Sequence, residues 1–128
     1  MNAMKTNLVG WFEIPVSNME RATAFYESVF NVKVHVEQFG PMLMGWFPHD
    51  DKLFGAGGAL VYNEEFYKPS TEGSLVYFNS EDVSNEISRI ETAGGKVIQD
   101  KTLISEEIGY MALFIDSEGN RIALHSQK

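Results

Sequence analysis

The alternation of apolar and polar residues predicts a first strand over residues 8–16. Successive side chains of a strand point to opposite faces, so Phe12 and Ile14 fall on one face and Trp11 and Glu13 on the other. Carboxylates are rare inside apolar strands, because the charge is costly to remove from water. Glu13 is therefore the first residue along the chain that requires a functional explanation.

The next segment has the periodicity of a helix. Apolar residues recur at three- and four-residue spacing through residues 18–30 and predict one buried stripe. Ser17 is expected to cap this helix, with Glu20 three residues later completing a capping box. Three strand-like runs then follow, at residues 32–39, 41–47 and 57–62.

The second half of the chain repeats this order of elements. A strand is predicted over residues 73–80 and a helix over residues 81–95, with Gly94 and Gly95 as its stop. Three further strands are predicted at residues 96–104, 109–116 and 120–126.

We therefore expect an α+β fold in which two tandem β-α-β-β-β modules form a curved mixed sheet. The modules cover about residues 8–63 and 73–126 of a single domain over residues 1–128. Neither half could cover its own sheet face, so pairing the two halves would bury it.

The two halves can be aligned with a constant offset. Trp11 matches Ser74, which gives 74 − 11 = 63 residues, and residues 31–34 match residues 94–97 with the same offset. Sequence identity between the halves is low, so the order and spacing of the elements carry the repeat.

Composition and charge narrow the function classes. The chain has 128 residues, no cysteine, and a formal net charge of -8 from 10 Lys+Arg and 18 Asp+Glu. The lack of cysteine excludes disulfides, zinc–thiolate sites, iron–sulfur clusters and cysteine nucleophiles. An acidic chain repels phosphate backbones, so nucleic acid is not expected as a partner. The sequence shows neither a signal peptide nor a membrane span, so we expect no membrane partner and a cytoplasmic location.

Two motifs carry a resemblance to a known family. "FEIPVSNMERATAFYESVF" is similar to the opening strand and helix of the vicinal oxygen chelate superfamily, and "LFIDSEGNRIALH" is similar to its closing hairpin. "GGALVY", "GSLVYFNSEDV" and "ETAGGKVI" resemble a short, glyoxalase-like subgroup. This superfamily holds glyoxalase I, extradiol dioxygenases, methylmalonyl-CoA epimerase, and fosfomycin- and bleomycin-resistance proteins.

The resemblance implies a ligand cavity on the concave face of the sheet, with the helices on the other face. Trp11 and Glu13 would then face the cavity, as would Ala123 and His125. The same alternation is expected to direct Ser74 and Val76 into the cavity and to place Leu75 and Tyr77 in the core.

The metal-dependent members hold one divalent ion with His, Gln or Glu from four strands. Carried over by resemblance, these positions fall on Trp11, Ala59, Ser74 and Ala123. An indole and two alanines have no lone pair to offer a metal, and a serine hydroxyl is a weak neutral donor. We therefore expect no metal cofactor at the usual four-ligand site.

Glu13 and His125 are the candidate catalytic residues. If the first and eighth strands approach each other, these two side chains could meet, and an apolar setting would make Glu13 a better proton acceptor. Three alternatives stay open at this point. Glu13 could be paired or solvated at a strand end, His125 could be exposed near the C-terminus, or the two could be displaced ligands of a divalent metal.

The other two histidines are expected outside the site. His35 alternates with apolar residues beside charged neighbours and is expected on a solvent face, and His49-Asp50-Asp51 is expected to be a solvated turn. Aromatic residues could line a flat cavity, with core or dimer-interface positions as the alternative. They are Trp11, Trp46, Phe47, Phe54, Tyr62, Phe66, Tyr67 and Tyr110.

Three functions agree with this sequence. The first is a homodimeric, glyoxalase-like protein that binds or transforms a small organic molecule without the usual metal. It is related to lactoylglutathione lyase by family resemblance only. The second is a non-catalytic protein of the bleomycin-resistance type that sequesters a small molecule. The third is a metal-dependent lyase or dioxygenase with displaced ligands.

Overall fold

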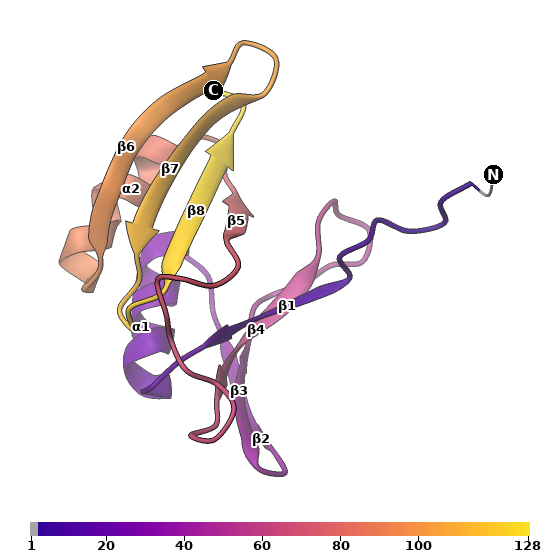
Figure 1. Cartoon of the computed structure of the whole chain (residues 1–128), viewed down its shortest axis with the longest axis vertical. Helices are drawn as coiled ribbons and strands as arrows, with labels where there is room; N and C mark the ends of the chain where they lie inside the picture. The colour runs from indigo at the N-terminus through magenta and orange to yellow at the C-terminus, as the bar shows by residue number, and fades with distance from the viewer. Residues whose placement is uncertain (1–2) are drawn as a thin grey trace.

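The computed structural model describes residues 3–128, and its elements form two four-stranded sheets and two helices (Figure 1). Both modules have the order strand, helix, three strands, so the predicted α+β class is confirmed. The first module consists of β1 (Trp11–Pro15), α1 (Met19–Phe30), β2 (His35–Phe39), β3 (Met42–Trp46) and β4 (Gly57–Tyr62). The second consists of β5 (Val76–Asn79), α2 (Val83–Ala93), β6 (Lys96–Ser105), β7 (Gly109–Ile115) and β8 (Arg121–Ser126).

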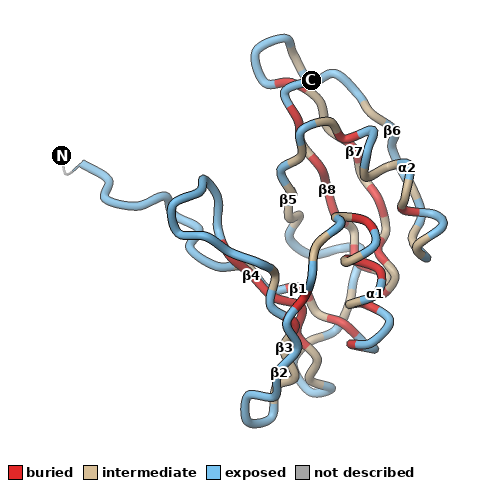
Figure 2. Tube along the Cα trace, turned by 180° about the vertical axis from the view of Figure 1, so that it is seen from behind, coloured by how far each residue is buried: buried red, intermediate tan, exposed pale blue. Residues whose placement is uncertain are grey.

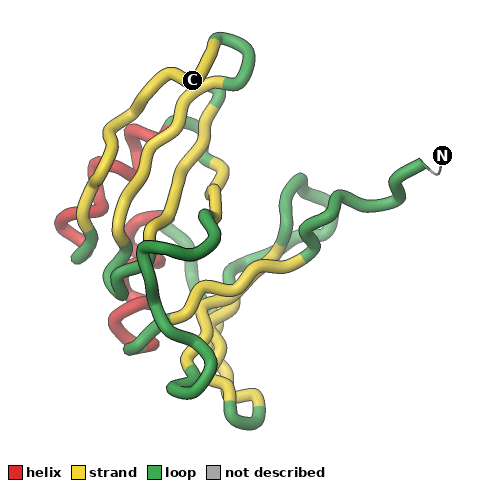
Figure 3. Tube along the Cα trace, viewed as in Figure 1, coloured by secondary structure: helices red, strands yellow, loops and turns green. Residues whose placement is uncertain are grey.

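Each module forms its own mixed sheet. The strand order is β1-β4-β3-β2 in the first sheet and β5-β8-β7-β6 in the second. The expected curved mixed sheet therefore takes the form of two separate sheets, and no strand pairing joins them among residues 3–128. As a result, β1 and β5 are both edge strands, and the first sheet runs away from the second (Figure 3).

The helices hold the two modules together. Helix α1 packs on β3, β4 and α2, and α2 packs on β6, β7 and β8. Apolar residues from both modules form one core, whose buried members include Ile14, Phe25, Leu60, Phe114 and Leu124. Buried positions accordingly run along β4 of one sheet and along β7 and β8 of the other (Figure 2). Neither helix is long and apolar enough to cross a membrane.

The N-terminus of α1 is capped differently from the prediction. Asn18, not Ser17, is the N-cap, and its Oδ1 accepts a hydrogen bond from the backbone N–H of Arg21 at 3.0 Å. The backbone N–H groups of Ser17 and Asn18 both donate to Oε1 of Glu118, at 2.8 Å each. A carboxylate from about 100 residues away in the sequence thus occupies the place predicted for a local capping box.

Glu118 is held by charge as well as by the helix end. The Arg21 guanidinium donates to it at 2.7 Å, and the Glu118 side chain is fully buried. Burial by itself would raise the pKa of Glu118. The hydrogen bonds from Arg21 and from the N–H groups of Asn18 and Ser17 outweigh this effect and hold that pKa below its ordinary value.

The rest of the β7–β8 turn is bonded into the first module. The Tyr26 hydroxyl donates to Asp116 at 2.6 Å, and burial followed by the Asp116 charge raises the pKa of Tyr26 well above its ordinary value. Asn120 donates to the carbonyl of Pro15 on β1 at 2.7 Å and accepts from the N–H of Ser70 in the connector between the modules. The turn therefore fixes α1, β1 and the connector together.

The true repeat offset is 64 in the strands. Glu13 pairs with Ala59 and Tyr77 pairs with Ala123, and 77 − 13 and 123 − 59 both equal 64. Helix α2 has 11 residues where α1 has 12, which explains why residues beyond the helices align at 63. A slip of one residue moves every side chain of a strand to its other face.

The predicted core position of Tyr77 on β5 is consequently wrong. Phe78 packs against the core, and its neighbour Tyr77 is 51% exposed on the opposite face. Val76 pairs with the core residue Ile122, and Tyr77 pairs with Ala123.

The Glu118 contacts predict a test of stability. We expect Glu118→Gln to lower the free energy of unfolding by about 2–4 kcal/mol, because it removes a buried charge from an arginine and two backbone donors. A carboxyl with a lowered folded-state pKa stabilises fully above its unfolded pKa and loses that contribution as the pH falls. Urea unfolding at several pH values should therefore show the difference between the two proteins shrinking below about pH 4.3.

Glu107→Gln is the matched control, because Glu107 lies exposed on the turn between β6 and β7. Equal stabilities of Glu118→Gln and this control at pH 7 would contradict the account of the module junction.

Candidate functional site

A cleft of about 700 Å³ lies between the edge strands β1 and β5. That volume suits a drug-sized organic molecule. The loop that leads into β4 forms the third side of the cleft, through residues 54–58. Most of the lining is apolar or glycine, and Glu13 is the one charged side chain among the residues that line it.

Phenylalanines form one wall of the cleft. The ring centroids of Phe12 and Phe78 lie 5.7 Å apart in an edge-to-face contact, and those of Phe30 and Phe78 lie 4.6 Å apart. Gly58 on β4 makes room for the first of these rings, because a Cβ at this position would lie only 2.3 Å from the Phe12 ring. The missing side chain thus lets an aromatic ring sit between the two modules.

Aromatic rings continue from the cleft across the face of the first sheet that lies opposite the helices. Trp11 contacts Trp46 edge to face with 5.3 Å between ring centroids, and Phe39 lies 5.7 Å from Trp46. The three residues come from β1, β3 and β2, so strand pairing alone brings them together. We call Trp11, Phe39 and Trp46 the aromatic face.

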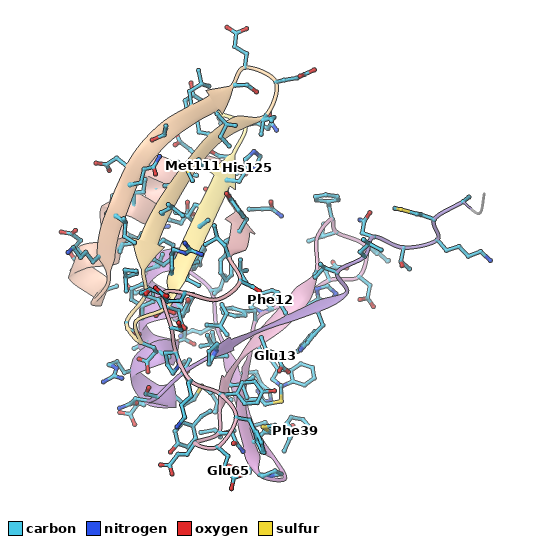
Figure 4. The ribbon with its side chains drawn as sticks, viewed as in Figure 1. Phe12, Glu13, Phe39, Glu65, Met111 and His125 are labelled. Carbon is cyan, nitrogen blue, oxygen red and sulfur yellow. The ribbon has the colours of Figure 1, made fainter. Side chains whose placement is uncertain are left out.

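Glu13 lies where the cleft meets the aromatic face (Figure 4). Its Oε1 accepts a hydrogen bond from the Tyr67 hydroxyl at 2.6 Å, and its Oε2 accepts one from the Trp11 indole N–H at 3.2 Å. The hydrogen bond to Glu13 is the main cause that raises the pKa of Tyr67. Tyr67 belongs to the connector and Trp11 to β1 itself, so one distant and one local contact orient this carboxylate.

His49 lies closer to the site than its sequence predicted. A Cβ on Gly57 would lie 3.0 Å from Nδ1 of His49 and 3.3 Å from the Trp11 ring, so these two side chains flank the same glycine. Nε2 of His49 is 3.0 Å from Asp51, and residues 49–51 are exposed, as the prediction of a solvated turn required. His35, in contrast, is exposed as expected and pairs with Glu37.

The two candidate catalytic residues do not meet within the chain. Figure 4 shows Glu13 on the first sheet and His125 near the far end of β8 on the second. Nε2 of His125 contacts the carbonyl of Ile108, and its cross-strand neighbours are Met111 and Asn79. The expected approach of the first and eighth strands is wrong for one chain, since β1 pairs with β4 and β5 with β8.

The other predicted cavity residues fall into two groups. Trp11, Ser74 and Val76 line the cleft. Ala59 and Ala123 lie in the middle of their sheets and are completely buried. Tyr110 packs against the core on the helix side, with the Lys101 ammonium 4.5 Å from its ring centroid.

The sequence profile of the Glyoxalase/Bleomycin resistance protein/Dioxygenase superfamily matches residues 8–124. The chain belongs to this superfamily. This is the group that the opening and closing motifs resembled, so that identification is confirmed.

Similar proteins are named either for a glyoxalase-type domain or for ligand binding. A "Glyoxylase-like domain-containing protein" from Didymella fabae is 28% identical over 119 residues and covers 91% of both chains. TnmS3, named as an antibiotic binding protein from Streptomyces sp. CB03234, is 25% identical with a TM-score of 0.68, over 98% of this chain and 100% of that chain.

Glyoxalase I from Zea mays shares the fold at 17% identity, with a TM-score of 0.68. The match covers 91% of this chain and 45% of that chain, so this protein spans less than half the length of the maize enzyme.

The superfamily's metal can be tested against the side chains at its four positions. Trp11, Ala59 and Ala123 offer no ligand atom. With the observed offset of 64, the counterpart of Trp11 is Leu75 rather than Ser74, and leucine offers none either. The residues present therefore do not fit a metal at these positions. Across residues 3–128, three or more His, Asp or Glu side chains nowhere gather closely enough to hold an ion elsewhere.

Proposed function

We propose that this protein is a small-molecule-binding member of the superfamily that takes its ligand in the cleft between β1 and β5, without the four-ligand metal. The observation that carries the proposal is the lining of the cleft. It combines an apolar, largely aromatic wall with a single oriented carboxylate, in a volume that suits an organic molecule.

Binding is favoured over acid–base catalysis by what surrounds Glu13. The remaining residues that line the cleft include no histidine, lysine, arginine or aspartate to act as its partner. The groups that contact Glu13, Tyr67 and Trp11, are both hydrogen-bond donors with no proton to exchange near neutral pH. The similarity over the full length to an antibiotic binding protein supports the same choice.

We propose that the protein forms a homodimer through the open edge of β5. The outer edge strands β2 and β6 have features that block pairing with a further strand. Strand β2 carries His35 and Glu37, and β6 carries Lys96 and Lys101 and has register shifts. Strand β5 has no charged residue at all, so its open edge has no such protection. A second copy would cover this edge.

The binding proposal predicts a response of the two tryptophans to a ligand. The chain has two tryptophans, and both belong to the aromatic face, so their indole N–H signals in NMR spectra report on the site directly. We expect quinoline, a flat neutral probe, to shift the Trp11 signal with the same affinity in the presence and absence of a chelator. Binding only after addition of zinc, nickel or manganese would contradict the proposal, as would no shift with any flat aromatic probe.

Two exposed phenylalanines supply a matched pair of variants. Phe54 is 86% exposed and lines the cleft, whereas Phe66 is 75% exposed and lies outside its lining. Phe54→Ser should weaken quinoline binding roughly 3–10-fold by removing an aromatic contact, and Phe66→Ser should leave it unchanged.

A separate prediction concerns the dimer. Light scattering should give twice the chain mass of 14.4 kDa, and Tyr77→Lys on the open edge should reduce it to that of one chain. Ile98→Lys is the control, since Ile98 is 50% exposed on β6 and lies away from β5. A wild-type mass of one chain at high concentration would refute the dimer and leave the binding proposal intact.

A further inference from the structure

We propose that the cleft selects organic cations that have a flat apolar body, and that Glu13 is the residue that selects them. The inference rests on the proposed function, because it assigns a ligand class to the same cleft. Four features of the structure carry it.

The first feature is the isolation of the charge. Glu13 is the one charged residue in the lining of the cleft, which otherwise consists of apolar, glycine, serine, asparagine and tyrosine residues. Phe12, Phe47 and Phe78 wall the cleft beside it. Glu13 is itself exposed, so a ligand that enters the cleft can reach its charge directly, at the short range where attraction is strongest.

The second feature is that this charge has no counter-ion. The ion pairs among residues 3–128 occupy Glu37, Asp51, Asp82, Glu86 and Glu118, and none of them involves Glu13. Strands β1 to β4 contain neither lysine nor arginine, so the first sheet offers no cation to neutralise it.

The third feature is the way in which Glu13 is held. Tyr67 and Trp11 each donate one hydrogen bond, one to each carboxylate oxygen. Neutral donors orient the carboxylate without cancelling its charge. Each oxygen also keeps acceptor capacity, since an ionised carboxylate has about four lone-pair sites. The group is therefore fixed in place and still available to an ammonium.

The fourth feature is the set of rings around the carboxylate. The Trp11 indole hydrogen-bonds to one oxygen of Glu13, and its ring centroid lies 5.3 Å from that of Trp46. The Tyr67 hydroxyl hydrogen-bonds to the other oxygen. The π face of an aromatic ring attracts cations, and that of tryptophan does so most strongly. The rings and the carboxylate therefore favour the same kind of ligand. The same carboxylate repels an anion of identical shape.

Three two-ring probes of nearly the same shape test the inference: N-methylquinolinium as the cation, quinoline as the neutral molecule and 1-naphthoate as the anion. Binding is measured by the Trp11 indole shift at pH 8, where quinoline is uncharged. We expect the cation to bind at least about 10-fold more tightly than quinoline, and the anion to bind most weakly.

The decisive variant is Glu13→Gln, which keeps the shape and removes the charge. It should reduce the advantage of the cation to about 2-fold or less while quinoline affinity stays the same. Glu107→Gln lowers the net negative charge by the same amount on a distant turn, and the advantage should survive in it. This control separates the local carboxylate from the overall charge of -8.

Equal affinities for the three probes would overturn the inference and leave the proposed binding function standing. An advantage that persists in Glu13→Gln would also overturn it and would assign the selection to the overall charge. If no probe of any charge binds, both the inference and the proposed function fail.

Discussion

The side chain of Glu118 is the contact on which the arrangement of the two modules depends. It extends from the β7–β8 turn of the second module and accepts hydrogen bonds from the backbone N–H groups of Ser17 and Asn18, just before α1, and from the Arg21 side chain. The N-terminus of a helix favours a negative charge, and a buried carboxylate requires such partners to remain ionised. One carboxylate thus binds the segment that leads into α1 and fixes the second module against the first.

This junction determines where the cleft opens. Asn120, from the same turn, bonds to Pro15 on β1 and to Ser70 in the connector, so it positions both segments that reach Glu13. The modules are joined through their helices and this turn, and their sheets do not pair within residues 3–128. The edges of β1 and β5 therefore remain open, with phenylalanines between them. The candidate site is a consequence of how the modules are held apart as much as of the residues that line it.

The sequence predicted the order of all ten elements, because periodicity and turn residues are local signals. It failed where local signals compete. Ser17 and Asn18 are both good capping residues, and only the distant Glu118 decides between them. The helix of the second module is one residue shorter than that of the first. An offset matched beyond the helices therefore assigns the residues of β5 to the wrong faces, and Tyr77 is exposed where a core position was predicted.

The candidate site was predicted only in part, for the same reason. Glu13 stood out as a carboxylate in an apolar strand, but its partner Tyr67 lies 54 residues away and no spacing rule connects them. His49 is exposed, as predicted, but no local signal indicates that it and Trp11 flank the same glycine, Gly57. Glu13 and His125 were paired on the assumption that the first and eighth strands approach, which depends on how separate sheets are placed.

The central claim is that this chain keeps the superfamily fold but has no metal ligands at the four positions that hold the ion in metal-dependent members. The most direct test is the metal content of tag-free protein after dialysis and after soaking with nickel, zinc, manganese, iron and cobalt in turn. The account predicts less than about a tenth of an ion per chain in every case, because Trp11, Ala59, Leu75 and Ala123 offer no ligand atoms. About one ion per chain would contradict it, and Glu13, His49 and His125 would then be the first ligands to examine.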